Sequence, residues 1–258
     1  MLTRNITAAR VRAQYRADRS ARQRARLIGN QADHVSGIYH RVYGCCADRE
    51  AIRQAVAGWF EIYPYRSACR QHIAIHEGAH FVAYEAEGML AADASVYSGP
   101  FGRGGWGGRA RAWNEPSITL MEQTTESLLG HARVTLAGPL AEALLADGDA
   151  ICQAYELMEA RALVGRAAEI SGHNDDLLWE QTLHETVQLI ERHSYEIKQL
   201  AALLMRRNLI TREQSEVRWI LARVVRSSAC NSAVSRRAAA LLGRLDFANV
   251  PSFREGRQ

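Results

Sequence analysis

Apolar residues recur at helical spacing over most of the chain, and this pattern predicts a mainly helical fold. The clearest case lies between residues 67 and 87, where Ile75, Ala79, Val82 and Ala86 fall on one face of a helix. Ser67 is a suitable N-cap for this helix, and Gly88 is suited to end it. Similar signals predict a helix over 48–63 and another from 124 onward, with a kink or a new first turn at Pro139. Two more helices are predicted over 149–170, capped by Asp149, and over 175–207, capped by Asn174. A last helix is predicted after a capping box of Thr211 and Gln214.

One short segment of the chain has strand character. Residues 94–97 predict a strand, and a glycine-rich loop around Trp106 follows it. The glycines of that loop are Gly99, Gly102, Gly104, Gly105, Gly107 and Gly108. The loop is interpreted either as the tip of a hairpin or as a flap that closes over a bound peptide. The expected fold class is therefore mainly α (α+β), with a small β-sheet.

The chain divides into three regions: a basic, arginine-rich lead that is expected to be helical or partly disordered (1–66), a central domain (67–222) and a tail (223–258). Asp18 is the only acidic residue before Asp33. The arginines of the lead are Arg4, Arg10, Arg12, Arg16, Arg19, Arg22, Arg24 and Arg26. Such a segment could bind nucleic acid or another anionic partner, serve as an organelle transit peptide, or remain a solvated or partly disordered arm.

Composition excludes several other classes of protein. With 47% hydrophobic residues the chain can bury a core, but no stretch approaches the roughly 18 consecutive apolar residues of a membrane span. The five cysteines have no CxxC spacing, which favours a reducing compartment such as the cytoplasm. Lys198 is the only lysine and follows Ile197, whereas the lysine of a phosphate-binding P-loop follows glycine.

The strongest chemical signal is an HExxH motif at His76, Glu77 and His80. Two histidines four residues apart lie on one face of a helix, so both imidazoles can bind a single zinc ion. The glutamate between them is suited to act as a catalytic base. Zinc is therefore the expected cofactor.

A catalytic zinc site needs a third protein ligand, and local spacing does not provide one. An extended HExxHxxGxxH site is excluded because Ala83 and Ala86 occupy the positions of its glycine and histidine. Glu85 and Glu87 lie on the same helix as the histidines, and Glu115 precedes a proline in a loop. The ligand must come from farther along the chain.

Three motifs in order resemble the protease domain of FtsH, the ATP-dependent zinc protease. They are HEGAH (76–80), AGPLAE (137–142) and SGHNDDL (171–177), which are similar to the HEAGH, AGRxAE and TGAxNDL signatures of that family. The resemblance extends from about residue 70 to about residue 222. It implies an FtsH-like helical peptidase domain, but the chain lacks the family's ATPase module and membrane segments.

The same resemblance implies roles for individual residues. His76 and His80 would be zinc ligands, Glu77 the catalytic base and Asp176 the third ligand, with Asp175 as its nearest rival. Two further residues have open roles. His72, one turn before His76, could approach the metal or have a structural role, and Glu142 could be a ligand, an orienting carboxylate or an ordinary surface acid.

The expected function is that of a zinc-dependent metalloendopeptidase acting on unfolded polypeptides, with an extended substrate paired to an edge strand near residues 94–98. The alternative is a catalytically silent module that docks a partner through its arginine-rich lead. A separate ATPase or adaptor could deliver substrate. Homo-oligomerisation is left open.

Overall fold

The computed structural model describes residues 2–44, 48–62, 69–98, 106–113, 123–146 and 154–226. These residues form eight α-helices and one three-stranded antiparallel sheet, so the expectation of a mainly helical fold with a small sheet is confirmed. Among the described residues, no helix has both the length and the apolar content that a bilayer crossing needs.

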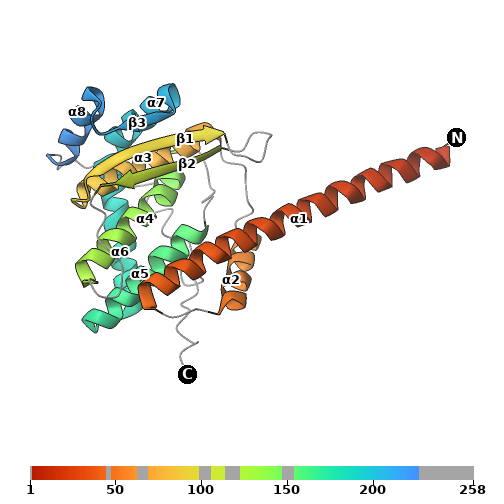
Figure 1. Cartoon of the computed structure of the whole chain (residues 1–258), viewed down its shortest axis with the longest axis horizontal. Helices are drawn as coiled ribbons and strands as arrows, with labels where there is room; N and C mark the ends of the chain where they lie inside the picture. The colour runs from red at the N-terminus through yellow and green to blue at the C-terminus, as the bar shows by residue number, and fades with distance from the viewer. Residues whose placement is uncertain are drawn as a thin grey trace.

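Helix α3 (Arg70–Ala86) is the centre of the fold. Every residue from Ile73 to Tyr84 except His80 is buried, and His80 is only partly exposed. The sheet lies over one side of α3, with α4 (Thr125–Leu145) and α7 (Ser194–Arg207) packed against the others (Figure 1). A helix enclosed in this way can present polar side chains only into the protein interior, which is where its HExxH motif lies.

The sheet has the strand order β2-β1-β3. β1 (Ala91–Ser98) pairs antiparallel with β2 (Trp106–Ala112) on one side and with the short β3 (Leu209–Thr211) on the other. The expected strand is therefore present, but it is the central strand and not an edge. Within the described sheet, β2 is the long edge strand. Gly107 and Gly108 belong to β2, while residues 99–105 of the predicted loop lie outside the described residues.

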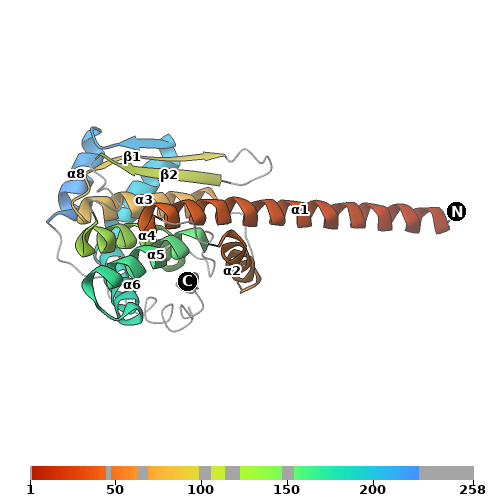
Figure 2. The ribbon, with the colours of Figure 1, turned by 60° about the horizontal axis from the view of Figure 1, so that its bottom comes forward.

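Helix α1 (Leu2–Tyr43) is the longest element, and its first half extends away from the rest of the protein in both views (Figures 1 and 2). Its second half packs along α5 (Ala154–Ser171) and α2 (Arg49–Ile62). The side chains of α1 and α2 that join the main core are Ile28, Ala32, Val35, Ile38, Tyr39, Val42, Ile52 and Val56. The lead and the central domain therefore share one hydrophobic core.

Two of the predicted helix starts are confirmed by their capping hydrogen bonds. Ser127 N donates to Thr124 Oγ1 over 3.1 Å at the start of α4, and Leu177 N donates to Asn174 Oδ1 over 3.0 Å at the start of α6 (Asp175–Arg192). The α2 prediction agrees to within one residue at each end. Ser67 and Asp149 lie outside the described residues. Pro139 is inside α4, which continues through it to Leu145.

Two helix predictions are wrong. The helix expected over 175–207 is two helices, α6 and α7, which meet at the buried His193. The capping box of Thr211 and Gln214 does not form, because Thr211 ends β3 and Gln214 takes the N-cap position of α8 (Ser215–Val224) without a side-chain hydrogen bond.

Candidate metal centre

The two histidines of the HExxH motif face helices α4 and α5, and Glu77 lies beside them under β2. His76 and Glu77 are buried, with 1% and 4% of their surface exposed. Helix α4 crosses α3 at this level, and α5 packs against α4. The first turn of α5 brings Glu156, also buried, to the two histidines. Residues of three helices, α3, α4 and α5, thus lie at one cluster.

His76, His80 and Glu156 are the residues whose ligand atoms converge. The Nε2 atoms of the two histidines are 3.0 Å apart. Glu156 Oε1 lies 3.3 Å from His76 Nε2 and 3.4 Å from His80 Nε2. Among the described residues, these three make a group of ligand atoms that lie within 4.8 Å of one another.

Neighbouring groups set the orientation of both imidazoles. His80 Nδ1 lies 2.7 Å from the carbonyl oxygen of Val134, so Nδ1 donates its proton there and leaves the lone pair on Nε2. His76 Nδ1 lies 3.4 Å from Glu142 Oε2. The other oxygen of Glu142 is 3.5 Å from Nδ1 of His72, and the Glu142 side chain is fully buried. Glu142 thus lies behind His76 and next to His72 without a hydrogen bond to either, in the position from which a carboxylate can orient a metal-binding histidine.

The electrostatics of the cluster favour a cation. Burial by itself lowers the pKa of the His76 imidazole, but the carboxylates of Glu156, Glu142 and Glu77 outweigh it and raise that pKa well above its usual value. Burial raises the pKa of Glu156, but the histidines outweigh this effect and lower it to about 2. Carboxylates that attract a proton so strongly to His76 attract a divalent cation for the same reason.

Glu77 lies beside this group but points to the sheet. A Cβ atom added to Gly108 of β2 would lie 2.5 Å from Glu77 Oε1 and 2.7 Å from Glu77 Cδ. The edge strand therefore passes directly over the Glu77 carboxylate. Burial raises the pKa of Glu77, and the charges of His76 and His80 oppose this shift only in part. A carboxyl group whose pKa is raised toward neutrality is suited to exchange protons.

The distances within the cluster match the requirements of zinc. Four ligands at about 2.0–2.1 Å from a tetrahedral zinc ion are separated from one another by about 3.3 Å. The three ligand atoms here are separated by 3.0–3.4 Å. Glu156 Oε2 is buried as well, lies 3.3 Å from His76 Nε2 and has no hydrogen-bond partner among the described residues, so both oxygens of this carboxylate are placed to face a cation. The residues present thus fit a zinc ion.

Gly138 of α4 provides the space beside the two Nε2 atoms. A Cβ atom at this position would lie 2.6 Å from His76 Nε2, 2.7 Å from His80 Cε1 and closer still to His80 Nε2. Atoms that are not bonded cannot approach so closely, and both imidazoles are held from behind. Any residue larger than glycine at position 138 would therefore displace the imidazoles of His76 and His80.

We expect Gly138→Ala to lower zinc affinity by at least about 10-fold, because the new methyl group must push the imidazoles out of position. Gly130→Ala is the matched control on the same helix, since its Cβ would meet only the ends of the Met89 and Glu87 side chains at 3.2 and 3.3 Å. Both changes favour the helix by up to about 1 kcal/mol. Competition titration with a zinc chelator measures the difference. Equal zinc affinity in the two variants would contradict this account of Gly138.

The structure does not bring Asp176 to the histidines. Its side chain is 84% exposed and pairs with Arg161 at 2.6 Å, and Asp175 also pairs with Arg161, at 3.0 Å. Arg161 lies on α5, so both acids fasten the start of α6 to that helix. The motif-based assignment of the third ligand to Asp176, or to its rival Asp175, therefore gives way to Glu156.

Sequence reasoning missed Glu156 because this residue lies in none of the three family motifs (76–80, 137–142 and 171–177). One signal was available. Glu156 and the apolar residues Ala160, Leu163 and Ala167 share one helix face, and all four are buried. A single glutamate on an otherwise apolar helix face must find a partner in the interior, which makes it a candidate ligand.

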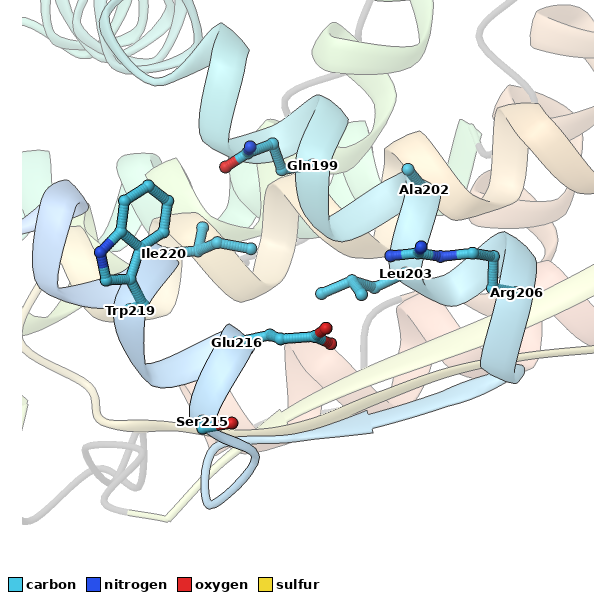
Figure 3. Close-up of a pocket in the computed structure, with 8 residues that line it drawn as sticks. All are labelled: Gln199, Ala202, Leu203, Arg206, Ser215, Glu216, Trp219 and Ile220. Carbon is cyan, nitrogen blue, oxygen red and sulfur yellow. The ribbon is translucent and has the colours of Figure 1, made fainter.

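One pocket of the described surface lies away from this cluster. A pocket of about 520 Å³ lies between α7 and α8 and is shown in Figure 3. The lining residues are Gln199, Ala202, Leu203, Arg206, Ser215, Glu216, Trp219 and Ile220. None of them is part of the His76, His80 and Glu156 group, so the pocket contributes nothing to the candidate metal centre.

Comparison with known proteins gives no further assignment. No protein-family model matches the chain, and no curated protein sequence matches it. The resemblance to FtsH thus rests on the three sequence motifs alone.

Proposed function

We propose that the protein is a zinc-dependent metallopeptidase of the FtsH type that hydrolyses peptide bonds in unfolded polypeptides. The observation that carries the proposal is the convergence of His76, His80 and Glu156 with a buried Glu77 alongside. A site that only holds zinc for stability needs no acid in Glu77's position. Two imidazoles, one carboxylate and an adjacent base are the components of a hydrolytic zinc site.

His76, His80 and Glu156 would hold the zinc ion, while Glu142 and the Val134 carbonyl keep the imidazoles in place. Zinc bound there would polarise the scissile carbonyl and lower the pKa of an attacking water molecule. Glu77 accepts the proton of that water as its oxygen bonds to the carbonyl carbon. Glu77 then delivers the proton to the amide nitrogen as the carbon–nitrogen bond breaks.

The edge of the sheet at β2 is suited to bind an extended substrate. β2 is paired on one side by β1, and the described residues add no strand on its other side. An extended peptide can pair with such an edge through main-chain hydrogen bonds. Because Gly108 of β2 passes over Glu77, a peptide on this edge would run next to the base. A tightly folded domain keeps most of its extended segments paired or buried, so unfolded chains are the expected substrates.

The second candidate is a catalytically silent module that docks a partner. The observation that favours it is the first half of α1, which extends away from the protein and carries an excess of arginines (Figure 2). Under this alternative, zinc is retained or lost without consequence for peptide hydrolysis. The same arm is compatible with the enzyme, for which it would dock a separate ATPase or adaptor.

Metal content and casein cleavage decide between these candidates. We expect about one zinc per chain and cleavage of casein that stops when zinc is removed with a chelator and resumes when it is returned. Zinc binding without cleavage of casein or of a peptide library would favour the silent module. A chain that binds no zinc would contradict the proposed site.

The same assay can be run with ATP and with a stable fluorescent β-barrel protein. We expect cleavage of casein to be independent of ATP and the β-barrel protein to stay intact, because the edge of β2 accepts only extended chains. The lone lysine cannot serve a P-loop. Stimulation by ATP without any other protein would show that a nucleotide site has been overlooked.

A further inference from the structure

The two oxygens of Glu156 have different surroundings. The Tyr155 hydroxyl donates a long hydrogen bond of 3.5 Å to Oε1. Oε2 is buried and has no hydrogen-bond partner among the described residues. The Tyr155 phenol therefore helps to fix the orientation of the carboxylate at Oε1, which is also the oxygen that lies 3.3 and 3.4 Å from the Nε2 atoms of His76 and His80.

Tyr155 in turn is held by helix α1. The ring of His34 packs edge-on against the Tyr155 ring, with centroids 4.8 Å apart and planes at 69°. His34 Nε2 also lies 3.3 Å from Oε2 of Glu159, one turn farther along α5. A single α1 side chain thus contacts two residues of the first turns of α5, on either side of Glu156.

The contacts of His34 lie at the N-terminal end of α5, which is less rigid than the middle of a helix. Glu156 is in the first turn of its helix, where backbone N–H groups lack intrahelical partners and helices fray. A ligand in that position is held less firmly than the histidines, which lie in the middle of the enclosed helix α3. Contacts from a neighbouring helix can restore the rigidity that a metal ligand requires.

We propose that helix α1 is part of the metal centre and sets its zinc affinity through the series His34, Tyr155 and Glu156. The inference rests on the zinc site of the proposed function but not on peptide hydrolysis. Tyr155 is a positioning residue here, because its hydroxyl contacts the Glu156 carboxylate and acts through it. The arginine-rich half of α1 is continuous with the half that carries His34, so a partner bound to the arm would act on the same helix that supports the third ligand.

Zinc titration of the full chain tests the proposal. We expect Tyr155→Phe to weaken zinc binding by roughly 10–100-fold and His34→Ala by about 10-fold, the range seen when outer partners of metal ligands are removed. The double variant should bind zinc no more weakly than Tyr155→Phe, because both changes act on the same carboxylate. At saturating zinc, the variants should recover the wild-type kcat/KM for a peptide substrate.

Tyr43→Phe is the matched control. The Tyr43 hydroxyl donates to the carbonyl oxygen of Ala162 over 2.9 Å, so this change also removes a hydrogen bond between α1 and α5. It should lower thermal stability slightly and leave zinc affinity unchanged. Circular dichroism establishes that every variant is folded before titration.

Four results would overturn the proposal, and the last of them would overturn the proposed function as well. Wild-type zinc affinity in both Tyr155→Phe and His34→Ala would mean that α1 does not support the ligand. An equal loss in Tyr43→Phe would mean that zinc affinity follows general α1 packing. Unchanged zinc affinity with a kcat that stays low at saturating zinc would make Tyr155 a catalytic group. A wild-type chain without zinc affinity would overturn the proposed function itself and this inference with it.

Discussion

Glu156→Ala should lower zinc affinity by more than about 100-fold, while Asp176→Ala should leave it unchanged. Losing one of three ligands costs more than losing an outer partner, for which the usual range is roughly 10–100-fold. Asp176 contacts Arg161 and is 84% exposed, so its removal should cost at most about 1 kcal/mol of stability. Zinc titration and thermal unfolding of both variants measure the two effects.

Asp175→Ala and Glu142→Ala complete this series. Asp175 pairs with the buried Arg161 and is itself only 13% exposed, so its loss should destabilise the fold more than Asp176→Ala does, without lowering zinc affinity. Glu142 orients His76, so Glu142→Ala should weaken zinc binding by an intermediate factor of roughly 10–100. Loss of zinc in Asp176→Ala with retention in Glu156→Ala would restore the assignment that the sequence motif implies.

Local features of this fold were predictable because they depend on neighbouring residues. Thr124 and Asn174 begin helices since their side chains accept backbone hydrogen bonds within the next three residues. The HExxH pair was predictable for the same reason, because positions four apart on a helix share a face. The break between α6 and α7 was not predictable in this way. No glycine or proline marks it, and the apolar pattern continues through His193, which is buried where the two helices meet.

The proposed third ligand, Glu156, could not be predicted from the spacing of residues in the sequence. Its identity depends on how α5 packs against α4 beside the histidines, and short-range spacing does not contain that information. The motif placed an acid at the start of α6, but Arg161 of α5 engages both acids there. The same helix supplies Glu156 one and a half turns earlier. The sheet edge was missed for a similar reason, since strand order depends on the late strand β3.

In the HExxH motif the two histidines would bind zinc and Glu77 would act as the base, so the second large expected effect is on peptide hydrolysis. Glu77→Gln should keep zinc, because Glu77 is outside the group of three ligand residues, and should lower peptide hydrolysis by roughly 100- to 10,000-fold through loss of the proton acceptor. Gly108→Ala should also keep zinc and lower peptide hydrolysis, because it displaces Glu77. Its methyl group would lie 2.5 Å from Glu77 Oε1 and must displace the carboxylate from its place under β2.

Gly107→Ala is the control for the strand, because its Cβ would meet the Tyr97 ring, beginning at 2.9 Å, and that side chain is 49% exposed and, among the described residues, held only by a 3.4 Å hydrogen bond to the Gly108 carbonyl. Zinc content and casein cleavage are measured on all three variants. We expect Glu77→Gln and Gly108→Ala to hold about one zinc per chain with hydrolysis reduced by at least about 100-fold, and Gly107→Ala to stay within a few-fold of wild type. Full peptidase activity in Glu77→Gln would exclude Glu77 as the base. Full activity in Gly108→Ala alone would mean that the carboxylate works from a position other than the one it occupies beneath the edge strand.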